Sequence, residues 1–232
     1  YWLTNNNKSI KIPSWLMPKS LHNKGNYIIS LGELCQWISE KAMELGVDIF
    51  PGFPAQKYLT DESGRVIGIA TGDMGIDKEG NQKGTYTPGM DILAKQTIFA
   101  EGARGHLGKK LIKEFNLDEG KTPQHFAIGF KEVWEVDNDK HSPGDVVHSM
   151  GWPLKGGTSG GGFLYHFDNN RIAVGLIVDL NYSNPSHSPF QEFQQFKQHP
   201  SIKQYLESGK RVSYGARAIT KGGINSLVKM EF

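Results

Sequence analysis

The order of apolar and polar positions predicts a helix soon after the start of the chain. Ser30 and Glu33 have the spacing of a capping box, in which each side chain bonds a backbone amide of the first helical turn. Gly46 stands where a glycine ends a helix. The apolar positions between them repeat at helical spacing and form one face: Leu31, Leu34, Cys35, Ile38, Ala42 and Leu45.

The segments that follow this helix predict an α/β unit with an antiparallel insertion. Val47–Phe50 reads as a strand that returns directly from the helix, as in a parallel crossover unit. Residues 55–59 and 65–70 form a hairpin pattern around the turn residues 61–64. Residues 72–89 are polar and glycine-rich, which indicates a surface loop or an irregular hairpin.

A strand, a tight turn and a helix are predicted around residues 97–108. Thr97–Ala100 is apolar or β-branched, the turn falls at Glu101-Gly102, and a helix begins near His106. Backbone amides at such a turn can hold a pyrophosphate, and glycine lets the ligand approach the chain closely. The same pattern also fits an ordinary turn between a strand and a helix.

After Gly120 the pattern changes to strands of an antiparallel sheet, followed by two helices. The strand-like runs are 126–130, 146–150, 162–167 and 171–180. One helix should begin at Ser188-Pro189 and end before His199, and a second should span 201–208. Phe190, Phe193 and Phe196 share one face of the first helix. Their expected role is core packing, and the alternative is the wall of an apolar tunnel.

Composition narrows the possible functions. The 232 residues carry a formal net charge of +2, which gives no support to nucleic-acid binding, and no apolar run is long enough to span a bilayer. One cysteine, Cys35, provides neither a disulfide nor a cysteine-ligated metal site. His125, His148 and His166 lack metal-ligand spacing, and no catalytic triad or carboxylate pair stands out.

Two further segments have more than one interpretation. Residues 1–25 are irregular, with Trp15, Leu16 and Met17 between two prolines and next to lysines. This segment is either a loop packed on the core or a membrane-surface segment. The glycine run that includes Gly160 and Gly161 is either a flexible hairpin loop or an exposed backbone that a flat ring can approach.

The chain as a whole resembles the electron transfer flavoprotein:ubiquinone oxidoreductase family. The similar segments occur in the family's order: 22–28, 45–47, 50–52, 97–102, 151–154, 161–166, 199–202 and 209–217. The family's amino-terminal dinucleotide fingerprint and its cluster cysteines have no counterpart here, so we expect a fragment of a longer protein that is inactive alone.

The resemblance implies a mixed α+β and α/β fold. Residues 1–25 would be a membrane-surface segment, 26–120 part of a Rossmann-like FAD domain, 121–218 an antiparallel-sheet ubiquinone-binding domain with flanking helices, and 219–232 the return toward the FAD domain.

It also assigns sites. Ala100, Glu101 and Gly102 match a flavin-contacting turn, Gly160 and Gly161 match a pair that meets a quinone carbonyl, and the Trp15–Met17 region matches a surface that enters one leaflet. Ser159, Gly162 and the Ala103-Arg104 pair depart from the expected pattern. No catalytic or metal-ligating side chain is assigned within this chain.

The implied activity is electron transfer from reduced electron transfer flavoprotein, through FAD and a four-iron four-sulfur cluster, to ubiquinone at a mitochondrial inner membrane or a bacterial cytoplasmic membrane. The alternatives are a flavin-dependent hydroxylase or isoprenoid reductase of similar architecture, and a non-catalytic membrane-binding domain.

Overall fold

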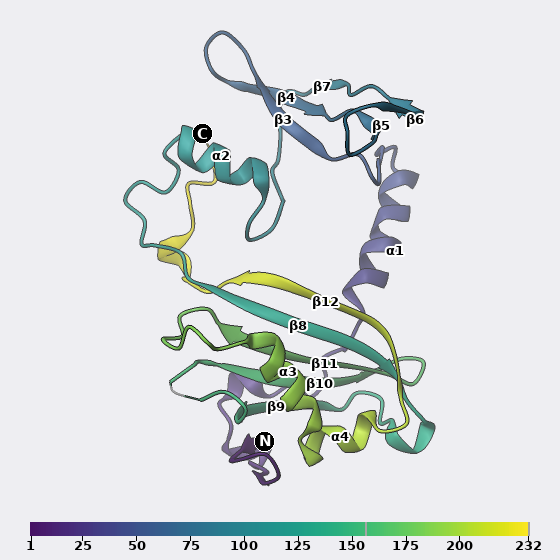
Figure 1. Ribbon diagram of the computed structural model, residues 1–232, viewed down its shortest axis with the longest axis vertical. Helices are drawn as coiled ribbons and strands as arrows, with labels where there is room; N and C mark the ends of the chain where they lie inside the picture. Colours follow the sequence, from purple (N-terminus) through teal and green to yellow (C-terminus); the bar gives the residue numbers. More distant parts are fainter. Residues whose placement is uncertain (156, 232) are drawn as a thin grey trace. The chain divides into compact units, whose positions relative to one another are not determined.

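A computed structural model describes residues 1–155 and 157–231 (Figure 1). The chain forms two compact units, one of residues 1–36 with 122–226 and the other of residues 37–121 with 227–232. Gly156 of the predicted glycine-rich loop and Phe232 of the predicted return segment lie outside the described residues.

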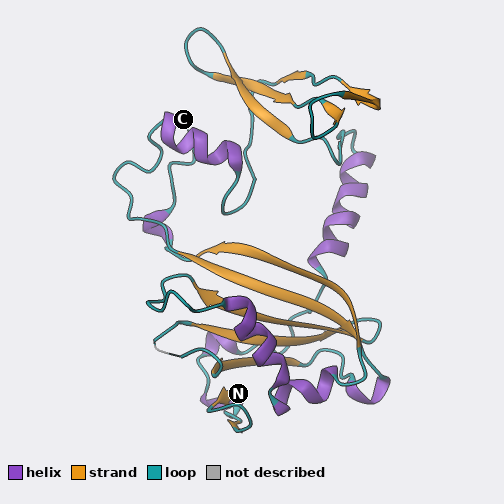
Figure 2. Ribbon diagram, viewed as in Figure 1, coloured by secondary structure: helices purple, strands orange, loops and turns teal. Residues whose placement is uncertain are grey.

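The first unit is built on a seven-stranded sheet, which Figure 2 shows in orange. The strand order is β12-β8-β11-β10-β9-β1-β2, and the pairs from β12 to β9 are antiparallel. The sequence predicted β8 to β11 as antiparallel strands, but it did not predict β12. Their bounds are β8 Phe126–Glu135, β9 Val146–Gly151, β10 Gly160–Phe167, β11 Arg171–Asp179 and β12 Lys210–Thr220.

The start of the chain joins this sheet, which the sequence did not indicate. Strand β1 (Trp2–Leu3) pairs in parallel with β9 and antiparallel with β2 (Ser9–Ile10). The short 3-10 helices Ser14–Leu16 and Lys19–Leu21 follow, which fits the two prolines that prevent a longer helix. Two more 3-10 helices span Asn138–Lys140 and Ile224–Ser226.

Helices α3 (Pro189–Gln198) and α4 (Pro200–Leu206) pack on one face of the sheet (Figure 1). Ser188 caps α3 as predicted, because its hydroxyl accepts the N–H of Gln191 at 3.4 Å. Phe193 and Phe196 are buried, with Phe193 stacked on Phe130 of β8 and Phe196 next to Gly162 of β10, whereas Phe190 is half exposed. Two of the three phenylalanines therefore serve the core. The other buried core residues include Leu164, Ile172, Val174, Leu176, Val178, Ile202 and Leu206.

The second unit contains the predicted hairpin. Strands β3 (Ala55–Thr60) and β4 (Val66–Thr71) pair antiparallel, and β7 (Asp91–Leu93) adds a third strand next to β4. Of the two possibilities for residues 72–89, a surface loop or an irregular hairpin, the structure shows the hairpin. Its strands β5 (Met74–Ile76) and β6 (Gln82–Thr87) pair antiparallel with a register shift. Helix α2 (His106–Glu114) begins where the sequence predicted it.

Helix α1 (Leu31–Glu44) also agrees with the sequence. The Ser30 hydroxyl accepts the N–H of Glu33 at 3.4 Å, and Gly46 adopts φ +85° at the end of the helix. The Glu33 carboxylate bonds Arg171 at 2.9 Å, which the capping-box pattern did not predict.

Two predicted strands are wrong. Residues 47–50 and 97–100 belong to no helix or strand and carry no strand pairing within the described residues. A parallel strand forms only where another strand lies beside it, and no described segment pairs with either. Their exposed apolar side chains, such as Phe50 and Ile98, fit unpaired segments of this kind.

Candidate functional site

The predicted quinone contact lies where β10 begins. On one side, Gly160 and Gly161 pair with Val178 and Ile177 of β11. On the other side, the ladder with β9 begins only at Gly162, opposite Ser149. The edge of β10 that faces β9 therefore carries no ladder pair before Gly162. Backbone groups of successive residues point to opposite edges of a strand, so Gly161 bonds toward Ile177 of β11, as Ser159 does toward Asp179, and Gly160 faces the unpaired edge.

Close packing explains why these positions are glycine. Gly160 has φ +156°, and a Cβ there would lie 2.2 Å from the carbonyl oxygen of Ile177. A Cβ on Gly161 would lie 2.7 Å from the carbonyl oxygen of Ser149. A Cβ on Gly162 would meet the Phe196 ring at 2.3 Å, on the opposite face of the sheet. Gly160, Gly161 and Gly162 are therefore a packed part of the sheet rather than a flexible loop.

A polar group adjoins this glycine pair. The ammonium of Lys221, directly after β12, donates to the Ser159 hydroxyl at 3.3 Å and forms an ion pair with Asp179. The backbone N–H of Asp179 donates to the Ser159 carbonyl at 2.9 Å. The hydrogen bond from Lys221 lowers the pKa of the Asp179 carboxyl, so this carboxylate is ionised at neutral pH.

Aromatic side chains follow along the same strand. Phe163 and Tyr165 alternate with core residues, so they share the face of β10 opposite α3 and α4. Their rings stack at 4.8 Å, and Tyr165 meets the His148 ring edge-on at 5.6 Å. Burial raises the pKa of Tyr165 and lowers the pKa of His148. Both rings are thereby held neutral near pH 7.

His148 and Tyr165 line a cavity of about 570 Å³ on this face. Its opposite wall comes from residues 21–29, which contribute apolar Leu21, Ile28 and Ile29 beside the polar side chains of two asparagines and a lysine. A volume of this size suits a small organic ligand. The cavity is a feature that sequence reasoning missed, because its walls are more than a hundred residues apart in the chain.

The three histidines have different surroundings. His166 is fully buried, and its Nδ1 accepts the N–H of Ser142 at 3.1 Å. Burial lowers the pKa of His166, and His141 nearby lowers it further. Among the described residues, the Nε2 atom of His166 has no hydrogen-bond partner, so this histidine is only half satisfied, whereas His148 faces the cavity. The carbonyl oxygen of His125 accepts the N–H of Lys221 at 2.8 Å.

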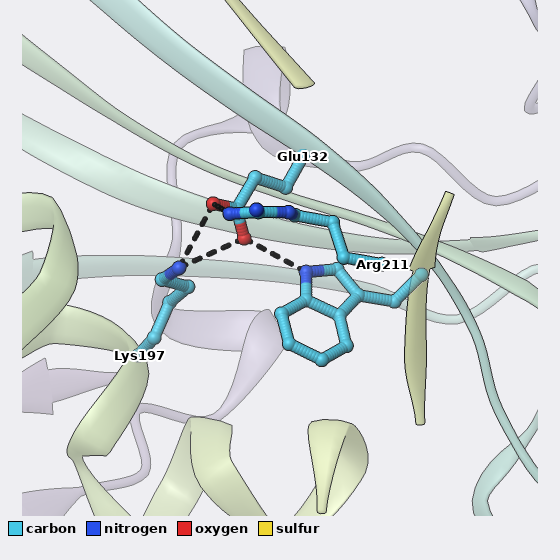
Figure 3. A network of polar contacts seen from close by, with 4 residues as sticks. Glu132, Lys197 and Arg211 are labelled. Carbon is cyan, nitrogen blue, oxygen red and sulfur yellow. Dashed lines mark hydrogen bonds and ion pairs between the residues drawn. The ribbon is translucent and has the colours of Figure 1, made fainter. Parts of the chain in front are cut away.

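A buried ionic network joins the helices to the sheet (Figure 3). The Glu132 carboxylate accepts both hydrogen bonds of Lys197 at 2.9 Å, one from Arg211 at 3.1 Å and one from the Trp134 indole at 2.9 Å. Burial alone would raise the pKa of Glu132, but these donors outweigh it and lower the pKa below its usual value. Both carboxylate oxygens of Glu132 accept hydrogen bonds, and the network ties α3 and β12 to β8, which indicates a structural role.

The predicted flavin turn lies in the second unit. Glu101 itself caps α2, since its carboxylate accepts the N–H of Gly108 at 2.6 Å and of Leu107 at 3.3 Å. Gly102 adopts φ +77°, and a Cβ placed there would have no atom within 4 Å. Ala100 is exposed. A phosphate would meet the Glu101 carboxylate at the start of α2, whereas the backbone at Gly102 is open to a ligand.

The predicted membrane contact lies in the first unit. The side chain of Trp15 is 75% exposed and that of Leu16 59% exposed, while Met17 is partly buried. Within the described residues, no helix is both long enough and apolar enough to cross a membrane. The described residues also contain no group of three metal-ligating side chains.

Comparison with known proteins identifies relatives of this chain. A family model described as "ETF-QO, ubiquinone-binding" matches residues 126–219. The chain is 60% identical over its whole length to electron transfer flavoprotein-ubiquinone oxidoreductase of Pseudomonas aeruginosa, of which it spans 42%. It is 48% identical over 96% of its length to the mitochondrial protein of the same name from Homo sapiens, of which it spans 36%.

Two solved structures share the fold. A geranylgeranyl bacteriochlorophyll reductase-like protein from Thermoplasma acidophilum covers 81% of this chain with a TM-score of 0.56 and 16% identity, over 41% of its own length. A flavoprotein/dehydrogenase from Cytophaga hutchinsonii covers 83% with a TM-score of 0.51 and 16% identity, over 42% of its own length. These similarities confirm the α+β fold.

Proposed function

Because this chain corresponds to about two fifths of a member of the electron transfer flavoprotein-ubiquinone oxidoreductase family, we propose that it serves electron transfer to ubiquinone. The electrons come from reduced electron transfer flavoprotein and pass through FAD and a four-iron four-sulfur cluster. The observation that carries the proposal is the match of residues 126–219 to the ubiquinone-binding family model, on a sheet whose edge is unpaired at Gly160 and Gly161.

The quinone headgroup contacts the backbone at Gly160 and Gly161 in this proposal. A carbonyl oxygen needs a hydrogen-bond donor, and the edge of β10 before Gly162 presents backbone groups without a ladder partner in β9. Phe163, the next residue on the same face, offers an aromatic surface for a flat ring. The cavity lined by Leu21, Ile28 and Tyr165 would take part of the isoprenoid tail.

FAD fits this chain at Gly102 rather than at the start of α2. The open backbone at Gly102 allows the cofactor to approach closely. The first N–H groups of α2 already donate to the Glu101 carboxylate, so they are not available to a phosphate. Bound FAD supplies chemistry that accepts electrons in pairs and passes them on singly. A cluster held by four cysteines needs more thiolates than Cys35 provides. This chain therefore contributes part of the flavin site and the quinone site.

The exposed side chains of Trp15 and Leu16 support contact with one leaflet of a membrane, because tryptophan favours the interface and nearby lysines favour lipid phosphates. The membrane would be the mitochondrial inner membrane, on its matrix face, or a bacterial cytoplasmic membrane. Such a position would admit a lipid-soluble quinone directly from the bilayer.

The test compares two neighbouring glycines in the full-length enzyme. Gly161→Ala places a methyl group at the proposed headgroup contact, whereas Gly162→Ala places it against Phe196 in the core. Both should lower thermal stability, but only Gly161→Ala should raise the KM for ubiquinone while flavin reduction by electron transfer flavoprotein stays normal. Equal quinone kinetics in the two variants would place the headgroup elsewhere. Direct oxidation of NAD(P)H without quinone dependence would overturn the proposed function.

A further inference from the structure

Ser159, Asp179 and Lys221 form a hydrogen-bonded group at the end of the strand that carries Gly160 and Gly161. They come from three different segments: the residue before β10, the last residue of β11 and the residue after β12. The Lys221 ammonium donates both to the Ser159 hydroxyl, at 3.3 Å, and to the Asp179 carboxylate. Because the Ser159 oxygen accepts from Lys221, its own hydrogen remains available to donate.

This group adjoins the proposed headgroup contact. Ser159 is covalently attached to Gly160, and its carbonyl accepts the N–H of Asp179 at 2.9 Å. Asp179 lies two residues after Ile177 on β11, so both share a face, and Ile177 is the partner of Gly161. A ring held by the backbone of Gly160 and Gly161 therefore has the Ser159 hydroxyl at one side and Phe163 at the other.

The geometry points to Lys221 as the proton donor of quinone reduction, acting through the Ser159 hydroxyl. This inference rests on the proposed function. Ubiquinone takes up two electrons and two protons to become ubiquinol, and the electrons come from reduced electron transfer flavoprotein. At one oxygen the C=O double bond becomes a C–O single bond, and a new O–H bond forms with the hydrogen of Ser159.

The proton balance closes at the protein surface. Ser159 regains its proton from the Lys221 ammonium, and Lys221 regains one from solvent, because its side chain is 47% exposed. The other quinone oxygen takes its proton from solvent. The ammonium charge also stabilises negative charge that develops on the nearby oxygen before the proton arrives.

The charges around Lys221 are suited to this task. Asp179 is the carboxylate in contact with it, and the hydrogen bond from Lys221 lowers the pKa of Asp179, with a smaller contribution from His125. The ionised Asp179 fixes the direction of the ammonium toward Ser159 without competing for its proton. Asp179 is thus a positioning residue, Ser159 donates the proton to the substrate, and Lys221 supplies that proton to Ser159.

The experiment uses the full-length holoenzyme with ubiquinone-1 as electron acceptor. Lys221→Met removes the charge and the proton, and Lys221→Arg keeps the charge but holds its proton far more strongly. The matched control is Arg171→Met, because Arg171 forms a 2.9 Å ion pair with Glu33 at the other end of β11. Flavin reduction by electron transfer flavoprotein, quinone turnover and its pH profile are measured for each variant.

We expect both Lys221 variants to lose roughly tenfold or more of kcat with quinone, since a general acid contributes about 10² to 10⁴ in rate. Flavin reduction should remain normal, and the alkaline limb of the pH profile should change. Arg171→Met should keep wild-type quinone kinetics. Full activity of Lys221→Arg would reduce Lys221 to a structural ion pair, and unchanged kinetics of Lys221→Met would overturn the inference. A wild-type enzyme that reduces no quinone would instead overturn the proposed function.

Discussion

The Nζ atom of Lys197 lies 2.9 Å from both carboxylate oxygens of Glu132, and this buried pair joins helix α3 to strand β8 (Figure 3). Both side chains are at least nine-tenths buried, and Lys197 also lies 4.9 Å from the centre of the Phe193 ring. Two residues that are 65 positions apart in the sequence thus decide how the helix packs on the sheet.

Replacement of Lys197 by Met should destabilise the first unit strongly. Removal of one partner of a buried ion pair leaves the other charge without compensation, which costs about 3 to 5 kcal/mol. Here Arg211 remains bonded to Glu132, so the lower end of that range is expected. The measurement is denaturant unfolding of the full-length enzyme. Lys203→Met, at an exposed position of α4, is the control and should change little. Equal effects of the two substitutions would contradict this role.

Acid should weaken the fold through His166. Its pKa is lowered from the usual 6.5, first by burial and then by His141, while Asp145 opposes the shift. The unfolded chain therefore binds a proton that the native state does not, so stability falls as the pH drops below about 6.5, by up to about 1.4 kcal/mol per pH unit. Unfolding free energy measured against pH gives this slope. His166→Gln should flatten it by about one proton, and an unchanged slope would assign the proton to another group.

The antiparallel sheet could be predicted from the sequence because its strands and turns are encoded by residues that are close together in the chain. Strand β10 alternates between buried and half-buried residues, β11 is a nearly continuous apolar run, and one tight turn connects the two strands. The helix caps at Ser30 and Ser188 are similarly encoded within three residues. Patterns of this kind depend on neighbours in the chain.

The rest depends on partners that are distant in the sequence. Thr97–Ala100 has the apolar pattern of a strand but no neighbouring strand among the described residues. The order of apolar residues within one segment does not tell whether a second strand lies beside it. The pairing of β1 with β9, the cavity and the Lys221 contacts with Ser159 and Asp179 all join segments that no periodicity connects. The glycine pair could be found from the sequence, but the polar group beside it could not.

The side chain of Glu101 should matter for the stability of α2. Its carboxylate bonds two N–H groups of the first turn, so Glu101→Ala should cost about 0.5 to 2 kcal/mol. Glu101→Gln keeps one acceptor oxygen and should lose less. Thermal unfolding of the two variants gives the comparison, and identical unfolding curves for wild type and Glu101→Ala would contradict the cap.

Gly102→Val should remove much of the FAD from the full-length enzyme. The backbone at φ +77° disfavours a branched residue, and the new side chain would stand where the cofactor approaches. Flavin content of the purified protein is the measurement. Gly120→Val is a suitable control, because Gly120 has φ +73° and an equally open surrounding but lies outside the proposed turn. Stoichiometric FAD in the Gly102 variant would separate this turn from the flavin site.

Replacement of Trp15, Leu16 and Met17 by serine should weaken binding of the full-length enzyme to phosphatidylcholine vesicles. Burial of a large apolar side chain contributes roughly 1.5 to 3 kcal/mol, and the first two are already exposed in the structure. The fold should remain intact, since the 3-10 helix at Ser14–Leu16 contributes no buried residue. Phosphatidylcholine has no net charge, so binding that depended only on the charges of Lys11 and Lys19 would be absent on these vesicles. On anionic vesicles such binding would occur, and added salt would weaken it. Unchanged binding of the triple variant to neutral vesicles would mean that residues 15–17 do not enter the leaflet.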